Sequence, residues 1–420
     1  MCATMSPSKS CDIAVIGAGP AGTTAAIRAG QLAKGVILAE RNDSIGRKIM
    51  MTGNGRCNLT NAASMDVFIK KFKPRGEFLR TAFFRFSNED LKELFRSKGL
   101  EMKIEENGKV FPVTDKASSV VRVLNEFLKE SKVDVVYGAR ITDIKYADGW
   151  FLINSESATR VKSRKVILAT GGASYKATGS TGDGFKMAER LGHKIVCIRP
   201  ALVPLKTKEI WVKELQGLSF ENVGLTAYCS GKKISSDIGE MMFTHFGITG
   251  PLVLDVSGDV ISCLEHEKDV NVDIDFKPDI TRDELEACLD REFSKKGGVH
   301  IDNFMQDVLP KRMAGVFLSL ADIATDKRAN QISKKERRVI ADMLKAFPLT
   351  ITGPLGLDEA MVTAGGVSMK DINPRTMESK IVPGLYFAGE IIEGSGQSGG
   401  YNLQQAFSTG YLAGENAANA

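Results

Sequence analysis

A glycine-rich turn between an apolar strand and an alanine-rich helix constrains this chain more than any other feature. The stretch CDIAVIGAGPAGTTAAIRAG begins with the apolar run 12–16, turns through GAGPAG and ends in helical residues. This is Gly-x-Gly-x-x-Gly in the strand–turn–helix context of a dinucleotide-binding fold. Gly17 permits the tight turn, Gly19 lets the backbone approach a pyrophosphate, and Gly22 lets the helix lie close to the strand. The helix N-terminus offers unpaired N–H groups and a partial positive charge to the phosphates.

An acidic residue ends the next apolar run. GVILAE closes with Glu40, 23 residues after Gly17, where dinucleotide folds place a carboxylate that binds a ribose diol. The structural alternative is a glycine turn followed by a solvated glutamate. The strand, the helix and the acid occur together in the required order, which favours nucleotide binding.

A long polar loop then replaces the continuation of a plain NAD-binding fold. Residues 41–61, RNDSIGRKIMMTGNGRCNLTN, are rich in glycine and asparagine and lack apolar periodicity. Their backbone N–H and C=O groups need partners if they are buried, and bound FAD would supply them along its pyrophosphate, ribityl chain and flavin edge. We expect Arg47, Lys48 and Arg56 to offset phosphate charge, and Asn54 and Asn58 to hydrogen-bond polar edges of the cofactor.

Cys57 is the single cysteine of this loop. Dithiol flavoenzymes carry a cysteine pair at about this place, and no second cysteine lies near Cys57 in the sequence. We therefore exclude disulfide cycling and favour a packed thiol beside the cofactor over a catalytic thiol. The seven cysteines of the chain are scattered and show no Cys-x-x-Cys spacing. We expect no zinc site and no disulfide framework, and a reduced, cytoplasmic protein.

Five blocks resemble the HI0933-like, or BaiN-type, three-domain bacterial flavoproteins, described as NAD(P)/FAD-dependent oxidoreductases. The blocks are GRKIMMTGNGRCNLTN, ILATGGASYKATGSTGDGFKMAERLGH, PALVPL, FTHFGITGP and VTAGGVSMKDINPRTMESKIVPGLYFAGEIIEGSGQSGGYNLQQAFSTGYLAG, in the family's order. Lys176 stands where the family usually has proline, and Gln405 where it often has tryptophan. Neither departure disturbs the flavin assignment, but both can alter the substrate pocket.

The resemblance implies further cofactor contacts. In similar flavoproteins the backbone near Ile141 meets the adenine, with an ordinary sheet position as the alternative, and Thr170 and Gly171 close over the nucleotide. Gly389-Glu390 stands where flavoproteins commonly have Gly-Asp, whose carboxylate binds ribityl hydroxyls. The helix expected at 403–414 would direct its N-terminus at the flavin N1–C2=O region and stabilise the charge of reduced flavin. The expected FAD-site residues are Gly17, Ala18, Gly19, Pro20, Ala21, Gly22, Glu40, Arg41, Arg47, Lys48, Thr52, Gly53, Asn54, Gly55, Arg56, Cys57, Asn58, Ile141, Thr170, Gly171, Gly389, Glu390, Gly400, Tyr401, Asn402 and Leu403.

The middle of the chain predicts two inserts. Short apolar runs, ALVPLKT, FENVGLTAYC, GPLVLDVSG and VNVDIDF, predict strands in a β-rich domain of residues 199–280 and 346–364. Residues 281–345 show helical apolar spacing and predict a nested helical domain. Residues 10–198 and 365–420 would form the FAD-binding domain. The predicted fold class is α/β: a two-segment, glutathione-reductase-like Rossmann domain with an inserted β-barrel-like domain and a nested small helical domain.

Two residue groups bear on catalysis. His245, in FTHFGITGP, can exchange a proton over the flavin or be a turn histidine bonded to backbone, and the resemblance favours the pocket role. Thr181 or Asp183 precedes an amphipathic helix, and we expect a helix cap there rather than a catalytic carboxylate. No metal-ligand cluster is indicated.

These features predict an FAD-dependent oxidoreductase that moves a hydride between flavin N5 and a small organic substrate. NAD(P)H is a possible electron donor, although no second Gly-x-Gly-x-x-Gly follows a strand. An oxygen-using flavin amine oxidase is one alternative, and an FAD-dependent RNA-modifying or RNA-binding protein is another. A net charge of +5 and 7% aromatic residues give little support for nucleic acid, and the absence of a long apolar run predicts no membrane span. The sequence does not specify the substrate or the oligomeric state.

Overall fold

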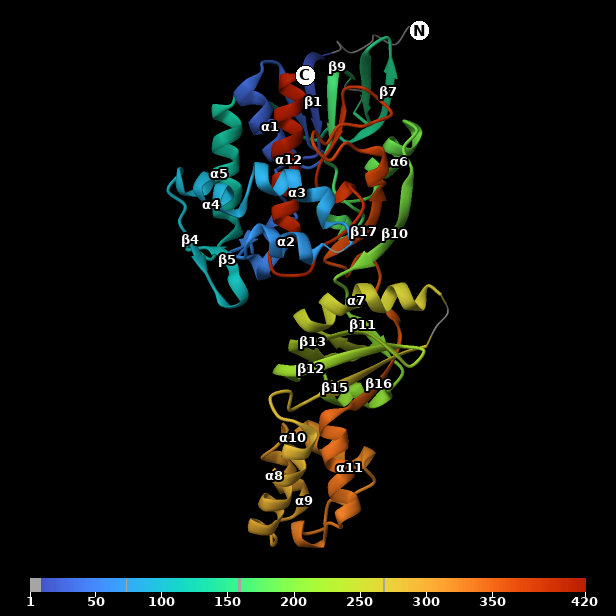
Figure 1. Ribbon diagram of the computed structural model, residues 1–420. Helices are drawn as coiled ribbons and strands as arrows, with labels where there is room; N and C mark the ends of the chain where they lie inside the picture. Colours follow the sequence, from blue (N-terminus) through green and yellow to red (C-terminus); the bar gives the residue numbers. More distant parts are fainter. Residues whose placement is uncertain (1–8, 73, 158–159, 267–268) are drawn as a thin grey trace. The chain divides into compact units, whose positions relative to one another are not determined.

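The computed structural model describes residues 9–72, 74–157, 160–266 and 269–420. It divides into two compact units, Met1–Ala201 with Leu357–Ala420, and Leu202–Gly356 (Figure 1). We expected the chain to pass between domains at 198/199 and 364/365, which lie about three and eight residues from these divisions. The helical segment 281–345 belongs to the same compact unit as the β-rich segment, so the three-domain division stays a prediction.

The first unit contains short and long strands from both ends of the chain. These are β1 (Lys9–Ile16), β2 (Val36–Ala39), β3 (Thr60–Asn61), β4 (Met102–Ile104), β5 (Lys109–Pro112), β6 (Asp134–Val136), β7 (Ile141–Ala147), β8 (Trp150–Ser155), β9 (Arg160–Leu168), β10 (Ile195–Ala201), β17 (Val362–Val367) and β18 (Leu385–Phe387). Its helices are α1 (Pro20–Leu32), α2 (Met65–Lys71), α3 (Gly76–Arg85), α4 (Asn88–Arg96), α5 (Ala117–Glu130), α6 (Asp183–Arg190) and α12 (Tyr401–Asn419).

A seven-stranded sheet forms the centre of this unit, in the order β6-β2-β1-β9-β8-β7, with β18 paired to β9. The strands β6, β2, β1, β9 and β18 run parallel, and β7 and β8 form an antiparallel extension. Residues Ile13–Ile16 of β1 are all buried, as expected of a parallel strand covered on both faces. The C-terminal strand β18 thus completes a sheet that the N-terminal strand begins.

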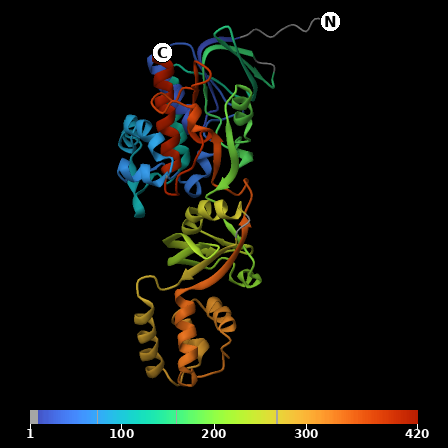
Figure 2. The same ribbon diagram turned by 45° about the vertical axis from the view of Figure 1, so that its right-hand side comes forward.

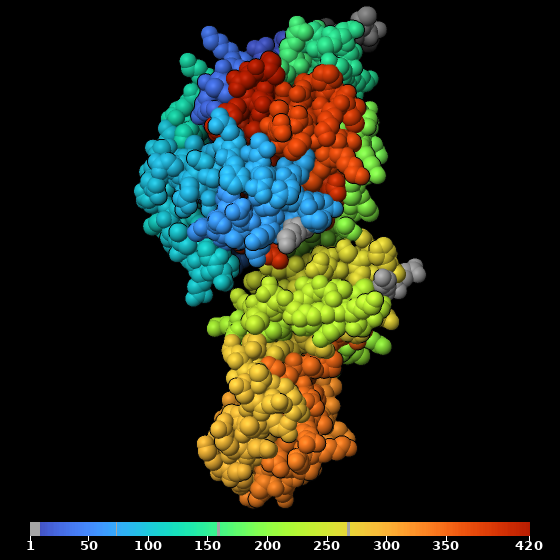
Figure 3. Space-filling view, in the orientation of Figure 1, coloured from blue at the N-terminus to red at the C-terminus, as the bar shows by residue number. Residues whose placement is uncertain are grey.

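Small residues let α1 and α12 pack closely. A Cβ atom on Gly410 would lie 2.2 Å from the carbonyl oxygen of Ala21, and one on Gly414 would lie 2.3 Å from that of Ala25. Figure 1 shows α12, in red, beside α1, in blue. The space-filling view shows α2 and α3, in light blue, next to the red and orange C-terminal part of the same unit (Figure 3).

The second unit is a closed barrel with helices. The barrel order is β11-β14-β13-β12-β15-β16, which confirms the predicted barrel-like insert. Its strands are β11 (Leu205–Thr207), β12 (Ser219–Cys229), β13 (Lys232–Phe243), β14 (Gly247–Thr249), β15 (Val270–Asp275) and β16 (Phe347–Pro354). Its helices are α7 (Pro251–Leu264), α8 (Arg282–Lys295), α9 (Ile301–Gln306), α10 (Lys311–Leu320) and α11 (Lys334–Lys345). Barrel and helices share one hydrophobic core, and Figure 2 shows α8 to α11 as a separate cluster of helices below the barrel strands.

Two sequence predictions for this unit were wrong. GPLVLDVSG was expected to be a strand, yet most of it lies in α7, which begins with Pro251; a short apolar run alone does not distinguish a strand from a buried helix. Cys229 and Cys263, expected to be free thiols, form a disulfide with a Cα–Cα distance of 6.1 Å. They are 34 residues apart in sequence, and only the folding of α7 beside β12 brings the ends of both elements together.

Candidate functional site

The glycine-rich turn joins β1 to α1 as the sequence predicted. Gly17 has φ +98°, and a Cβ atom on it would lie 2.7 Å from the carbonyl oxygen of Ala169. A Cβ atom on Gly22 would lie 1.8 Å from the carbonyl oxygen of Gly17. A Cβ atom on Gly19, in contrast, would meet no atom within 4 Å. The first and third glycines are therefore required by the fold, whereas the second leaves open space in front of the N-terminus of α1.

Glu40 ends β2 beside this turn and is 6% exposed. Its Oε2 accepts a hydrogen bond from the Ala18 backbone N–H at 2.7 Å, and its Oε1 accepts from the Asn42 backbone and side chain at 2.8 and 2.7 Å. The carboxylate thus braces the glycine turn against the next loop. Its predicted contact with a ribose stays a prediction.

The polar loop after β2 holds several residues in the left-handed backbone region. Gly53, Asn54, Gly55 and Cys57 have φ values of 55°, 56°, 82° and 65°. Glycine and asparagine are the residues that adopt this conformation at least cost. The Asn58 amide reaches Gly400 N at 3.1 Å and Thr60 O at 3.0 Å, and Thr52 Oγ1 donates to Ile49 O at 2.8 Å. This loop is therefore held by its own turns and by the segment that begins α12.

The three cations expected at the phosphates all pair with carboxylates. Arg47 lies 2.9 Å from Asp43. Arg56 lies 2.8 Å from Asp115, pairs also with Glu105, and stacks over Phe111. The charge of each arginine is thus compensated within the protein, and their contact with the cofactor stays a prediction.

Lys48 belongs to a network that joins four distant segments. Its Nζ lies 2.9 Å from Glu390 Oε2 and donates to Ser174 Oγ at 2.6 Å. Glu390 Oε1 also accepts from Ser174 Oγ at 3.1 Å and from the Thr363 backbone N–H at 2.7 Å. The predicted ribityl-binding glutamate is therefore fixed in place by a lysine from the N-terminal loop.

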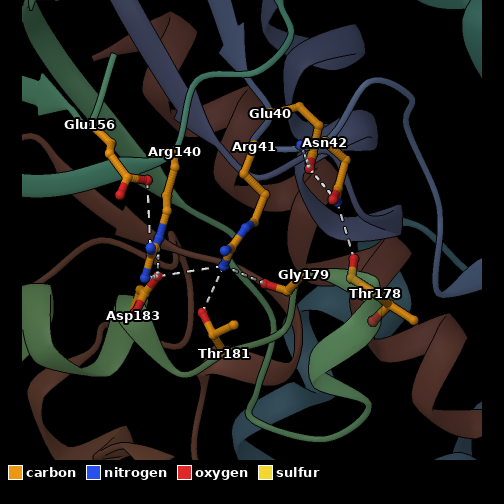
Figure 4. Close-up of polar contacts among 9 residues, drawn as sticks. All are labelled: Glu40, Arg41, Asn42, Arg140, Glu156, Thr178, Gly179, Thr181 and Asp183. Carbon is orange, nitrogen blue, oxygen red and sulfur yellow. Dashed lines mark hydrogen bonds and ion pairs between the residues drawn. The ribbon is translucent and has the colours of Figure 1, made fainter. Parts of the chain in front are cut away.

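A second network lies on the Glu40 side of the sheet (Figure 4). Arg41 donates to Gly179 O at 3.2 Å and to Thr181 Oγ1 at 2.8 Å, and lies 3.5 Å from Asp183. Arg140 lies 3.0 Å from the same carboxylate. These cations keep Asp183 charged: although burial opposes it, the pKa of Asp183 is lowered by hydrogen bonds from Thr181 and Arg140 and by both arginine charges.

The expected helix cap was therefore wrong. The residue before α6 is Gly182, with φ +78° and no side-chain cap, and Asp183 is the first helical residue. The carboxylate of Asp183 instead lies 3.5 Å from Arg41 and 3.0 Å from Arg140, and such ionised pairs are among the stronger hydrogen bonds in proteins. Sequence spacing did not reveal this, since Arg41, Arg140 and Asp183 are brought together only by the sheet.

Cys57 is fully buried. Burial raises the pKa of its thiol to about 12, and a hydrogen bond with Thr52 opposes this only in part. A thiol with such a pKa stays protonated and is a poor nucleophile. This geometry agrees with a packed thiol rather than a catalytic one.

Ile141 lies on the edge strand β7 of the same sheet, whereas Thr170 and Gly171 follow the interior strand β9. Ile141 begins β7, pairs with Ser155 and is 6% exposed. Thr170 follows β9, and its buried Oγ1 has no hydrogen-bond partner among the residues that the structure describes. Gly171 has φ +72°.

The C-terminal segment brings the remaining predicted residues together. Gly389 has φ +78°, and a Cβ atom on it would lie 2.7 Å from the Cβ of Ala21. A Cβ atom on Gly400 would lie 2.2 Å from Thr60 O, so α12 begins against β3. Asn402 Oδ1 accepts from Gly396 N at 2.8 Å. Tyr401 packs its ring on Phe68 at 4.8 Å, and Leu403 is partly buried on the main core.

His245 lies in the second unit, in the turn between β13 and β14. It is exposed, and its ring packs edge-on against Phe246 at 5.0 Å. Its proposed proton-transfer role stays a prediction. Within the described residues no group of three or more His, Cys, Asp or Glu side chains is arranged to hold a metal ion, and no helix there is long and apolar enough to cross a membrane.

The residues of the first unit fit FAD. A Cβ atom on Gly19 would meet no atom within 4 Å, and Gly19 directly precedes α1, whose N-terminal N–H groups form the kind of site that binds phosphates. This point is at the carboxyl ends of the parallel strands, where doubly wound folds bind their ligands. Glu40 lies toward β2 on one side of β1, and Lys48, Ser174 and Glu390 gather beyond β9 on the other. We call the set of Gly19, Glu40, Lys48, Ser174 and Glu390 the cradle; it presents different polar groups at its two ends, as binding of FAD requires.

This fold and this cradle define a flavoprotein oxidoreductase with a Rossmann-type FAD-binding domain. The chain belongs to the HI0933-like family: residues 11–416 match the HI0933-like protein Rossmann domain, which confirms the resemblance.

Proteins similar to this chain include two that are named for an activity. The 3-dehydro-bile acid delta(4,6)-reductase of Clostridium scindens is 34% identical over 408 residues, covering 97% of this chain and 98% of that protein. The ribosomal RNA dihydrouridine synthase of Haemophilus influenzae is 31% identical over 403 residues, covering 94% and 96%.

Solved structures share the fold at low identity. A flavocytochrome c3 fumarate reductase superposes with a TM-score of 0.52 at 16% identity, covering 98% of this chain and 79% of that one. The 3-ketosteroid delta1-dehydrogenase of Sterolibacterium denitrificans has a TM-score of 0.53 at 12% identity, covering 98% and 100%.

Proposed function

We propose that this protein is an FAD-dependent reductase of carbon–carbon double bonds conjugated to a carbonyl in a small organic substrate, with NAD(P)H as electron donor. The observation that carries the proposal is the 34% identity to the bile-acid delta(4,6)-reductase over 97% of the chain. In each reduction, one hydride and one proton add across an activated double bond.

Bound FAD supplies the hydride-transfer chemistry at its N5 atom. The free space at Gly19 and the carboxylate of Glu40 would hold the nucleotide. Lys48 fixes Glu390 beside the loop that carries Ser174. The N-terminus of α12 offers partial positive charge to a developing anion.

Stopped-flow kinetics of the purified holoprotein test this proposal. We expect NADH or NADPH to bleach the flavin absorbance anaerobically, and a 3-dehydro-Δ4,6 bile acid to restore it as one of its two double bonds is reduced. Reduction by simple amines and reoxidation by air alone would support the oxygen-using amine oxidase instead. A flavin that no nicotinamide reduces would contradict the proposed donor.

Ribosomal RNA uridine is a second candidate substrate. The Haemophilus influenzae relative, at 31% identity, is named for that activity, and the 5,6 double bond of uridine is likewise conjugated to a carbonyl. The chemistry required of the flavin site is therefore the same. Incubating the holoprotein and NADPH with rRNA that lacks dihydrouridine, followed by nucleoside mass spectrometry, distinguishes the two substrates. Formation of dihydrouridine would reverse our expectation of no nucleic-acid partner.

A further inference from the structure

The loop between β9 and α6 is attached near both ends of the nucleotide cradle. Ser174 Oγ bonds to Lys48 and Glu390, whereas Gly179 and Thr181 bond to Arg41. Because Glu40 and Arg41 follow β2, and Glu390 follows β18 on the other side of β1, Ser174 lies in the half of the cradle away from Glu40. That half receives the flavin if Glu40 binds the ribose of the adenosine.

Tyr175, next to Ser174, has a strained and firmly held backbone. Its φ is +52°, in the left-handed region, which costs about 1 kcal/mol or more for a residue other than glycine. Its carbonyl oxygen accepts from Thr178 N and Thr178 Oγ1, both at 2.8 Å, and the preceding Ser174 is completely buried. The hydrogen bonds of Thr178 hold the backbone after Tyr175, and the buried Ser174 holds the backbone before it. Together they restrict the direction in which the tyrosine side chain leaves the loop.

The Tyr175 hydroxyl makes only a weak hydrogen bond within the described residues. Among the described residues its one hydrogen-bond partner is Met361 Sδ at 3.6 Å, and a thioether sulfur is a weak acceptor. Met361 is 46% exposed, so the hydroxyl lies beside an accessible apolar side chain. A phenol in this position can give its hydrogen bond, and then its proton, to an incoming molecule.

Other side chains with acidic protons in this half of the cradle are less suited to donate a proton to a bound molecule. Lys48 Nζ directs its donors to Ser174 and to both oxygens of Glu390. Cys57 is fully buried and its pKa is raised to about 12. Ser174 is itself buried and donates to Glu390.

We propose that Tyr175 is the proton donor in the reduction of the double bond, an inference that rests on the proposed function. The substrate β-carbon accepts a hydride, and with it two electrons, from the NAD(P)H-reduced flavin. The C=C π bond breaks, its electron pair moves to the α-carbon and the carbonyl, and the α-carbon takes the proton of Tyr175 Oη. The phenolate then recovers a proton from water, so the substrate gains one hydride and one proton in total.

The variant Tyr175→Phe tests this role, with Tyr146→Phe as the matched control. Tyr146 is also partly exposed, at 38%, and lies on β7. We expect Tyr175→Phe to slow reoxidation of the reduced holoprotein by a 3-dehydro-Δ4,6 bile acid about 100-fold. Reduction by NADPH, FAD affinity and the unfolding midpoint of the apoprotein should stay unchanged. Tyr146→Phe should stay within about twofold of the wild type in every measurement.

The position of solvent deuterium gives a readout that a merely structural role would not move. In D2O the wild type should place deuterium on one face of the substrate α-carbon, because a fixed donor delivers it. In Tyr175→Phe, deuterium from water should appear on both faces. A variant that keeps the wild-type rate and one-faced labelling would overturn the role of Tyr175 alone. A wild type that reduces no such double bond would overturn the proposed function, and the inference with it.

Discussion

Lys48 Nζ lies 2.9 Å from Glu390 Oε2, although the two residues are 342 positions apart in the sequence. Their side chains are 21% and 20% exposed. The pair ties the polar loop after β2 to the turn after β18, and Ser174 and Thr363 add two more segments to the same carboxylate. The two ends of the chain are thereby joined at the cradle.

Removing the lysine should therefore destabilise the protein even without a cofactor. In Lys48→Met, Glu390 keeps a partly buried charge that has lost its cation, and we expect the free energy of unfolding to fall by about 1–3 kcal/mol. Urea unfolding of the apoprotein measures this. The double variant Lys48→Met/Glu390→Gln should recover part of the loss because the charge is gone too. Arg47→Met, which breaks an exposed pair with Asp43, should have no measurable effect; an equal loss in both single variants would argue against the network.

Substitution of two glycines of the turn by valine should have different effects on folding and on FAD binding. Gly19→Val adds atoms only to open space, so we expect a folded protein whose FAD affinity falls at least 100-fold. Gly22→Val places a Cβ atom 1.8 Å from a backbone oxygen and should fail to fold. Circular dichroism and FAD titration separate the two effects. A purified Gly19→Val protein that stays yellow would show that the pyrophosphate does not lie there.

The thiol of Cys57 should be unreactive toward alkylating reagents in the folded protein. With its pKa raised to about 12 and no exposed surface, it should resist iodoacetamide at pH 8 in the folded protein and react after unfolding. The exposed Cys197 and Cys288 serve as internal controls in a Cys2→Ser background. Cys57→Ser should change the rate of flavin reduction less than about twofold; a loss of about 100-fold would restore the catalytic-thiol interpretation.

His193 should make stability depend on pH. The ring is 3% exposed and bonds to Ala188 O at 3.1 Å and Ser379 Oγ at 2.7 Å. Burial lowers its pKa below the usual 6.5, although the hydrogen bond with the Ala188 backbone and the charge of Asp371 oppose the shift. The unfolded chain then takes up a proton first as the pH falls, so stability should decline from about pH 6.5 down through the lower pKa of the folded state. Urea unfolding between pH 8 and 5 should show a shallower decline for His193→Gln; identical declines would exclude this histidine as a cause.

Much of the fold followed from local pattern. The run 12–16, the glycine turn and Glu40 belong to one βαβ unit. Such a unit is recognisable in sequence because its parts are close together along the chain. The barrel was recognised from short strands, and helices α8 to α11 from their apolar spacing. The segment 250–258 was misread because α7 is buried along much of its length, and such a helix lacks the periodicity of an amphipathic one.

Side-chain partners were harder to foresee. Lys48 was assigned to phosphates because it lies in a loop near the cofactor, but its contact with Glu390 spans nearly the whole chain. Arg140 and Asp183 were not predicted as a pair because they are 43 residues apart and meet only through tertiary contact. Ser174, Thr363 and Asn42 carry no recognisable motif, and only the sheet order places them at the cradle. The Cys229–Cys263 disulfide likewise depends on tertiary contact.

The completion of the central sheet by β18 has a consequence for synthesis on the ribosome. The second unit, Leu202–Gly356, emerges whole before β18 and α12 are translated. At typical elongation rates, on the order of ten seconds or more separate the synthesis of the end of the first segment from that of the start of α12. The nascent N-terminal segment waits through that interval with an incomplete cradle, so we expect tight flavin binding only after β18 and α12 have emerged.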